Sequence, residues 1–341
     1  MNCKERLISI LHKQKVDRPA FICPGGMMNM VVSEVMETLG CYWPEAHTDP
    51  AMMAELALGT HRLTCIENLG LPFCLTVEAE AMGAGVDLGS REHEPRVISY
   101  AVDRMAEIAR LPDMDLTRGR SKTCLDAVRI LKQQNLDLPI IANLSGPMTL
   151  TTSLIDPLVF YRALRREKGA AHLLTKLAMK NIIAFGDALV EAGADVICIS
   201  DPSATGSLIG KAAFEEFALP YLNEITEHFR NKFNVPAIVH ICGDVSGLGQ
   251  ALNEISAEAV SIDSMVGIDV LRKLAPNVLT MGNISTLLLE RGQPDELFYA
   301  GLTCISKGAD IVAPACGISP RTPVKNIKRL AESVINHPDT Y

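Results

Sequence analysis

Residues 195–263 decide the fold: DVICIS (195–200), a long amphipathic segment at 211–231, AIVHI (237–241), a second helical segment at 248–255, and AVSID (259–263). Each apolar run is short and rich in β-branched residues, which is typical of a strand buried on both faces. The segments between the runs have the spacing of helices. Strands and helices that alternate in this way predict a parallel sheet with helices on both sides.

The same alternation continues on both sides of this stretch. We expect further strands at 20–23, near 73–77, and at 138–143, 278–282 and 310–313, and further helices at 2–14, 170–192, 295–307 and 323–335. Eight such units close into a single (β/α)8 TIM-type barrel. A doubly wound open sheet is the alternative.

The N-terminal third fits the repeating pattern less well. Residues 25–113 hold at most one expected strand among several helices or loops. We interpret 24–113 as an elaboration over the barrel mouth and not as a separate domain. The prediction is therefore one barrel domain spanning 1–341 with an elaborated N-terminal region, a length that barrels of this type commonly reach.

Composition and charge exclude several classes of protein. The net charge of −8 and the lack of a basic cluster argue against nucleic-acid binding. The apolar window 181–200 is interrupted by Asp187, Glu191 and Asp195, so we expect no membrane span. The N-terminus lacks a secretory signal and the ten cysteines are scattered, which together indicate a reduced cytoplasmic protein.

Polar and metal-binding residue types follow most of the expected strands. In an α/β barrel, the active site lies at the carboxyl ends of the strands. The residues expected at this end are Asn143, Ser145, Asp201, His240, Cys242, Asp244, Asp263, Asn283 and Cys316.

Three of these residues form a possible metal site. His240 and Cys242 are two positions apart at a strand end, so both side chains can face the barrel axis. Cys316 follows the last strand. One imidazole and two thiolates suit Zn²⁺ with an open fourth position. The alternative is that these side chains are buried thiols and a hydrogen-bonded core histidine.

The chain resembles a known family almost from end to end. The resemblance is carried by YWPEA (42–46), LTVEAEAMG (75–83), SGP (145–147), FALPY (217–221), HICGD (240–244) and the segment 313–323. These motifs are similar to those of the uroporphyrinogen-decarboxylase-like superfamily, in the branch of corrinoid-dependent methyltransferases that includes methylcobamide:coenzyme M methyltransferases.

The resemblance implies a zinc-dependent methyl transfer. The zinc signature of that branch, HxC followed far downstream by Cys, falls on His240, Cys242 and Cys316. The implied reaction moves a methyl group from a methylated corrinoid, carried by a partner protein that docks over the barrel mouth, to a small thiol such as coenzyme M. Porphyrin decarboxylation is disfavoured, because FICPGG (21–26) replaces the arginine-rich loop of the true decarboxylases.

Further site residues follow from this interpretation, each with a structural alternative. Glu80 and Asp263 are candidates for the fourth zinc position, unless Glu80 pairs with a neighbour and Asp263 orients the imidazole. Arg321 is a candidate for holding an anionic end of the acceptor, unless it is a surface arginine at a helix start. The remaining candidates, which would shape the substrate pocket or serve as structural hydrogen-bonding groups, are Asn143, Asp201, Tyr221 and Asn283.

Two other functions stay open at this point. A demethylase component would move a methyl group in the opposite direction, from a methylated compound onto a corrinoid protein. A non-catalytic zinc-binding scaffold would show a closed site of four ligands instead of an open one.

Overall fold

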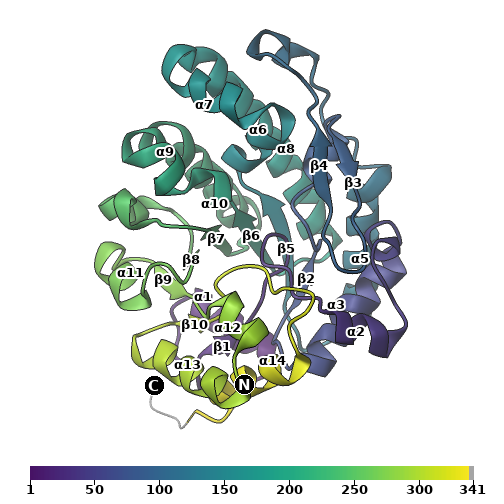
Figure 1. The fold of residues 1–341 in the computed structure, drawn as a ribbon, viewed down its shortest axis with the longest axis vertical. Coiled ribbons are helices and arrows are strands. Elements are labelled where there is room, and N and C mark those ends of the chain that lie inside the picture. The colour runs from purple at the N-terminus through teal and green to yellow at the C-terminus, as the bar shows by residue number, and fades with distance from the viewer. Residues whose placement is uncertain (338–341) are drawn as a thin grey trace.

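Eight parallel strands form the central sheet of the computed structural model, which describes residues 1–337 (Figure 1). Every residue of these strands is buried except Leu279, as expected for a sheet with helices on its outer face and a filled interior. The strands are β1 (Ala20–Phe21), β2 (Leu69–Leu71), β5 (Ile140–Ser145), β6 (Val196–Ser200), β7 (Ala237–Ile241), β8 (Ala259–Ile262), β9 (Leu279–Met281) and β10 (Ile311–Val312).

Strand order follows chain order around the barrel. Hydrogen-bonded neighbours run β1-β10-β9-β8-β7-β6-β5-β2, so only β1 and β2 lack a partner strand on one side. A hydrogen bond from the Glu67 amide to the Phe21 carbonyl (2.8 Å) spans this seam. The Asn68 side chain accepts from the Cys23 amide (2.8 Å) and donates to the Cys23 carbonyl (3.0 Å). The (β/α)8 barrel is thus closed between β1 and β2 by one backbone hydrogen bond and by the side chain of Asn68.

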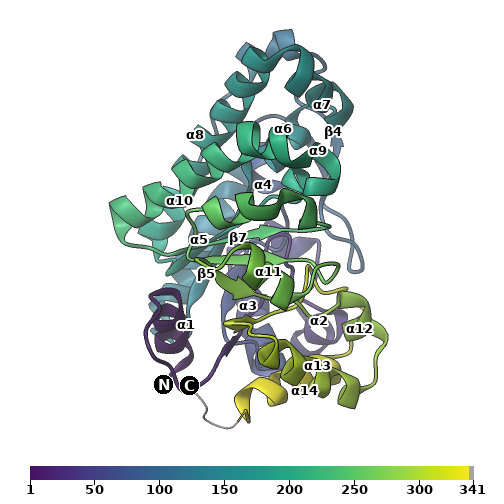
Figure 2. The ribbon, with the colours of Figure 1, turned by 90° about the vertical axis from the view of Figure 1, so that its left-hand side faces the viewer.

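Helices fill every connection between consecutive barrel strands except β7 to β8, which has a 3-10 segment. Figure 2 shows α6, α7 and α9 together at one end of the molecule. The α-helices are α1 (Cys3–Leu11), α2 (Ser33–Leu39), α3 (Pro50–Thr64), α4 (Val77–Ala81), α5 (Gly119–Gln133), α6 (Pro147–Leu154), α7 (Pro157–Arg166), α8 (Lys168–Ala192), α9 (Gly206–Ala213), α10 (Leu219–Phe233), α11 (Ile268–Leu274), α12 (Thr286–Arg291), α13 (Pro294–Ser306) and α14 (Val324–Ile335). The 3-10 segments are η1 (Glu45–His47), η2 (Met105–Arg110), η3 (Pro202–Ala204) and η5 (Ser246–Glu254), and η4 (Phe214–Ala218) is a π-helical turn.

One expected strand was misplaced. The sequence favoured a strand near 73–77, but β2 is Leu69–Leu71, and Val77 instead begins α4. The true strand contains Gly70 and is followed by Pro72, two residue types that weaken a strand signal. Gly70 is required there because a Cβ at this position would lie 2.0 Å from the Pro24 carbonyl oxygen. Close approach of two backbones therefore hides this strand from pattern analysis.

The stretch 25–113 holds more strands than expected. Besides β2 it contains an antiparallel hairpin, β3 (Gly85–Asp87) and β4 (Arg96–Ser99). The loop of this hairpin packs on an N-terminal aromatic residue, because the Arg91 guanidinium lies 3.8 Å from the centre of the Tyr42 ring. The interpretation of 24–113 as an elaboration of one domain stays a prediction.

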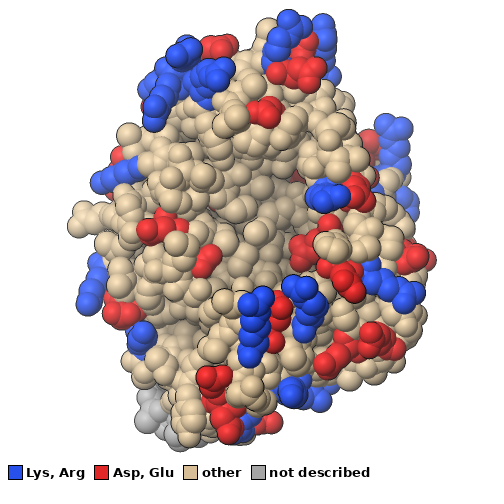
Figure 3. All heavy atoms as spheres, in the orientation of Figure 1, with Lys and Arg blue, Asp and Glu red and all other residues tan. Residues whose placement is uncertain are grey.

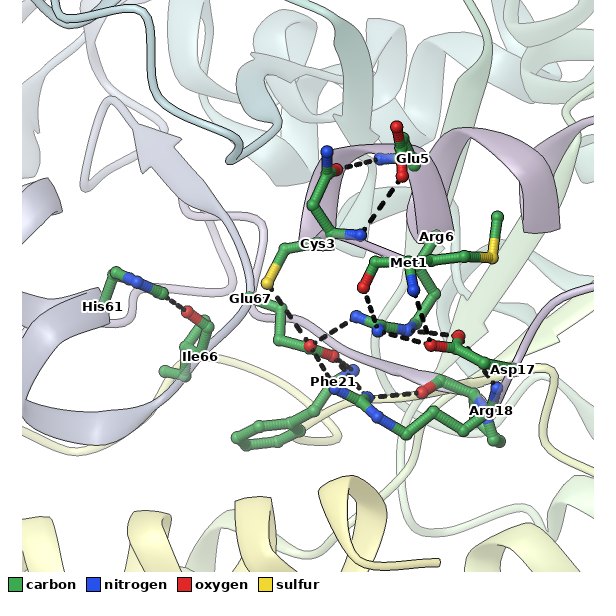
Figure 4. A network of polar contacts seen from close by, with 12 residues as sticks. Met1, Cys3, Glu5, Arg6, Asp17, Arg18, Phe21, His61, Ile66 and Glu67 are labelled. Atoms are coloured by element: carbon green, nitrogen blue, oxygen red, sulfur yellow. Dashed lines mark hydrogen bonds and ion pairs between the residues drawn. The ribbon is translucent and has the colours of Figure 1, made fainter. Parts of the chain in front are cut away.

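A buried charged network ties the N-terminus to the barrel seam (Figure 4). Glu67, just before β2, accepts hydrogen bonds from Arg6 (2.8 Å), Arg18 (2.7 Å) and the Phe21 amide (2.9 Å). Arg6 also pairs with Asp17. Since the Arg6 and Glu67 side chains are 5% and 4% exposed, each charge depends on its partners to offset the cost of burial. The network therefore fixes α1 and the entry to β1 against the entry to β2.

Hydropathy adds one further finding. Within residues 1–337, no helix combines the length and apolar character that crossing a membrane requires. The cytoplasmic location inferred from the sequence stays a prediction.

Candidate metal centre

The end of strand β7 and the loop after β10 bring together three metal-binding side chains. His240 is on β7, Cys242 follows directly after β7, and Cys316 lies in the loop after β10. One ligand atom from each of the three lies within 4.8 Å of the others. The 74-residue separation of the two cysteines is closed by the barrel, and their sulfur atoms are 3.4 Å apart. The structure thus brings together the three residues that the sequence singled out.

The His240 imidazole is oriented by the neighbouring strand. Parallel register places His240 opposite Ser261 of β8, and the ring Nδ1 lies 3.0 Å from the Ser261 hydroxyl. That hydroxyl also lies 3.7 Å from the sulfur of Met28. His240 is 0% exposed, and its other nitrogen, Nε2, is buried with no hydrogen-bond partner. With the ring proton on Nδ1, the buried Nε2 has a free lone pair, which a metal ion would satisfy.

The sulfur atoms of Cys242 and Cys316 lie within hydrogen-bonding distance of each other, and a cation bound by both would replace the proton of that bond. Cys242 lies within hydrogen-bonding reach of both the Cys316 sulfur (3.4 Å) and Asp263 Oδ2 (3.1 Å). The hydrogen bond to Cys316, together with burial, raises the pKa of the Cys242 thiol. The same hydrogen bond lowers the pKa of Cys316 below its ordinary value, so this sulfur is the first to become a thiolate. One imidazole with two cysteines is the ligand chemistry of zinc.

Asp263 and Asn283 support the loop after β8. Asp263 Oδ2 accepts from the Gly243 amide (3.3 Å) as well as facing Cys242. Burial opposes the charge of Asp263, but the hydrogen bonds that it receives, foremost from Cys242, lower its pKa overall. Asn283 donates to the backbone carbonyls of Asp263 (2.9 Å) and Val266 (2.6 Å). Both predicted residues therefore lie at the cluster: Asp263 lies beside Cys242, and Asn283 supports the loop that carries Asp263.

Three other predicted residues have partners outside the cluster. Glu80 forms an ion pair with the buried Arg120 (2.5 Å), which matches the structural alternative given for it. The Tyr221 hydroxyl lies 2.8 Å from His172 Nδ1, at the contact between α8 and α10. Arg321 lies 3.5 Å from a carboxylate of α12, with 71% of its side chain exposed. The structure does not bring these three residues into the group of possible metal ligands.

Asn143 and Asp201 lie on the barrel interior and at the start of α6. Asn143 on β5 donates its side-chain amide to the Pro24 carbonyl, and its oxygen is buried without a partner. Asp201 accepts from the Thr149 amide and hydroxyl (2.7 Å each), both in the first turn of α6. Burial raises the pKa of Asp201 to about 6. Asp201 thus stabilises a helix start, whereas Asn143 has an acceptor available for a ligand.

Sequence reasoning missed two residues at the site. Ser261 was inside an expected strand, and only the register between β7 and β8 identifies it as the partner of His240. Glu94, in the β3–β4 loop, is within electrostatic range of Cys316. Burial raises the pKa of Glu94 to about 7. No pattern in the sequence indicated that this hairpin reaches the site.

The segment 25–30 packs against the loop that carries Cys316. A Cβ at Gly317 would lie 2.5 Å from the Met27 carbonyl oxygen, so the two backbones are in direct contact. The Ile318 amide donates to the Asn29 carbonyl (2.8 Å). Met28 is fully buried beside Ser261. The segment 25–30 is therefore partly a wall of the site and partly core.

A family model and curated relatives both match nearly the whole chain. The model described as "Uroporphyrinogen decarboxylase (URO-D)" covers residues 2–337. A "Methylcobamide:CoM methyltransferase MtbA" of Methanosarcina acetivorans is 32% identical over 336 residues, which is 98% of each chain. A "Methylcobamide:CoM methyltransferase MtaA" of Methanosarcina barkeri is 32% identical over 331 residues, which is 96% of each chain.

A solved structure agrees with these matches. A methyltransferase from Methanosarcina mazei superposes with a TM-score of 0.91 and covers 98% of each chain at 29% sequence identity. The match spans nearly the whole chain, the stretch 24–113 included.

Proposed function

Because the chain belongs to the uroporphyrinogen decarboxylase (URO-D) family and is similar to methylcobamide:CoM methyltransferases over nearly its full length, we propose that it is a corrinoid:coenzyme M methyltransferase. The single observation that carries this proposal is the cluster of His240, Cys242 and Cys316 at the barrel mouth, with a buried and unpartnered imidazole nitrogen.

The residues present fit a zinc ion, and the proposal assigns it the three ligands of this cluster. Zinc, when bound there, would lower the pKa of an added thiol so that it is a thiolate at neutral pH. Only the thiolate is a competent nucleophile, whereas a free alkyl thiol is mostly protonated at that pH. The ligand set leaves a fourth position for the acceptor sulfur.

The chain itself would hold the ligands in place before the substrates arrive. The Ser261 hydroxyl fixes the ring of His240 so that Nε2 faces the cluster. Asp263 accepts from the Gly243 amide, next to Cys242, and Asn283 holds the loop of Asp263. Such fixed side chains need little rearrangement when substrate binds, which is how positioning contributes to rate.

The methyl donor in this proposal is a methylated corrinoid on a partner protein, as the names of the relatives suggest for their donor. Transfer breaks the cobalt–carbon bond and forms a sulfur–carbon bond, so cobalt(III) becomes cobalt(I) and the thiolate becomes a thioether. The reaction needs alignment of sulfur, carbon and cobalt more than it needs an acid or base. Arg321 stays a candidate for the anionic end of the acceptor.

The proposal is tested by assaying methyl transfer from methylcob(III)alamin to a thiol and, separately, from other methyl donors to cob(I)alamin. The purified protein is mixed with free methylcob(III)alamin and coenzyme M, and loss of the methylcobalamin absorbance is followed. The expected result is transfer to the thiol that is lost in Cys316→Ala together with bound zinc. Methyl transfer only onto cob(I)alamin from another donor, or turnover unchanged in Cys316→Ala, would contradict the proposed function.

A further inference from the structure

Helix α7 presents an exposed face that is apolar at its start and cationic at its end. Leu158 is 73% exposed, and Arg162, Arg165 and Arg166 are all exposed. No ion pair joins these three guanidinium groups to any carboxylate within residues 1–337, although nearby Lys168 pairs with Glu216 (2.6 Å). Positions 158, 162 and 165 share one side of a helix because of their spacing. Three unpaired cations and a leucine thus face solvent together.

The arginine end of this face forms one wall of a groove, which we call the α7–α9 groove, and Leu158 lies outside the lining of that groove. One wall of the groove is formed by the end of α7 and the start of α8, and the other wall by α9 and η4. The volume of the groove is about 690 Å³. Its floor is apolar and includes Leu164, Ile209 and Phe217, whereas its α7 wall carries the three arginines. Such a groove fits an acidic surface with apolar side chains at its centre.

The groove lies at the end of the barrel that carries the metal ligands. Helix α9 follows β6 through η3, and α7 follows β5 through α6, so both helices begin from carboxyl ends of barrel strands. Figure 3 shows a hollow lined by uncharged atoms in the middle of this face, and Lys and Arg side chains gathered at its upper left, where Figure 1 places α7. A partner that covers the hollow is therefore within reach of α7.

Helix stability explains only part of this arrangement. Cations in the last turn of a helix interact favourably with its dipole, which accounts for Arg165 and Arg166. It does not account for Arg162, nor for an exposed Leu158 in the first turn. The net charge of the chain is −8, so three unpaired cations beside an apolar groove give this part of the surface a charge opposite to that of the whole protein. Local charge of this kind steers and orients an oppositely charged partner.

We propose that the α7–α9 groove is the docking surface for the corrinoid-carrying protein, which meets it with an acidic surface. This inference rests on the proposed function, because only a partner that delivers a methyl group must cover the barrel mouth. The arginines would fix the partner's orientation so that its corrinoid faces the hollow. Free methylcobalamin has no such acidic surface and would enter without using the groove.

Two methyl donors separate docking from chemistry. The donor protein is isolated from the organism that encodes this chain by following protein-bound cobalt, and is then reduced and methylated with methyl iodide. The variant Arg162→Glu/Arg165→Glu/Arg166→Glu is compared with wild type on this donor and on free methylcob(III)alamin. We expect the KM for the protein donor to rise at least tenfold, while turnover of the free donor is unchanged within a factor of two.

A second charge-reversal variant controls for net charge. Lys15→Glu/Lys273→Glu/Lys307→Glu changes the charge by the same amount, at exposed positions that precede barrel strands and so lie at the opposite end. We expect this variant to keep the wild-type KM. Added salt should raise the wild-type KM for the protein donor and should have a smaller effect on the arginine variant.

Calorimetric titration with the donor protein gives a reading that does not need turnover. Binding at least tenfold weaker in the arginine variant than in the lysine variant supports the docking surface. Equal binding by both variants, or a wild-type KM for the protein donor no lower than for free methylcobalamin, would overturn it. Absence of wild-type turnover with the free donor would instead count against the proposed function.

Discussion

The hydrogen bond between Ser261 and His240 provides a direct test of how the metal ligands are held. In Ser261→Ala, the ring Nδ1 of His240 loses the hydroxyl that lies 3.0 Å away. Both residues are 0% exposed, so water does not replace the lost partner readily. The substitution also removes only one atom, and the methyl group of alanine keeps most of the packing.

The expected loss of zinc affinity in Ser261→Ala follows from the burial of His240 and from the role of its Nε2 as a metal ligand. An unsatisfied buried polar group costs about 1–3 kcal/mol of stability. Metal binding at Nε2 makes the Nδ1 proton a stronger donor, so the lost bond matters more in the metal-bound protein than in the free one. Partners of this kind are typically worth about 10- to 100-fold in metal affinity. We therefore expect zinc to bind Ser261→Ala about 10- to 100-fold more weakly than wild type.

Competition with a chromophoric chelator measures this affinity without any need for turnover. Ser264→Ala is the matched control, because Ser264 is nearby and donates to Asp263 (3.2 Å) but does not contact His240. A Ser261→Ala protein with wild-type zinc affinity would refute the role assigned to this hydrogen bond, as would an equal loss in the Ser264→Ala control.

Two other buried groups give predictions that need only stability measurements. Burial lowers the pKa of His47 from 6.5 to about 3, so between these values the unfolded chain binds a proton that the folded chain does not. Its contribution to stability is therefore complete above pH 6.5 and is lost as the pH falls, by about 2 kcal/mol between pH 7 and pH 5. His47→Phe should remove that part of the acid sensitivity in urea unfolding, and an unchanged slope with pH would contradict it. Glu67→Gln leaves Arg18 facing a neutral partner in a buried place and Arg6 with Asp17 as its only carboxylate, and it should cost about 3–5 kcal/mol. Asp126→Asn, in an exposed ion-pair cluster, should cost less than about 1 kcal/mol. Equal losses in these two variants would show that the seam network is not held by charge.

The barrel was predictable because its strands carry a strong local signal. Runs such as 196–200 and 237–241 are apolar at nearly every position, since both faces of the sheet are covered. The strand 69–71 carries no such signal, because Gly70 is present for close contact with the Pro24 backbone and not for strand formation. Its position depends on tertiary contact, which pattern analysis does not contain.

The same distinction holds at the site. His240 and Cys242 were identifiable because alternate residues at a strand end face one way, and Cys316 because it follows the last strand. Ser261 depends on strand register, and Glu94 depends on where a hairpin loop folds. Glu80 and Tyr221 were selected for their residue type, but their partners, Arg120 and His172, decided where they lie.

The central claim is that His240, Cys242 and Cys316 hold one zinc ion with room for an incoming sulfur. Zinc X-ray absorption of the purified protein, with and without coenzyme M, tests this most directly. The account predicts one zinc per chain with two sulfur ligands, rising to three when the thiol is added. Absence of zinc, or a sulfur count that does not change on addition of the thiol, would contradict it.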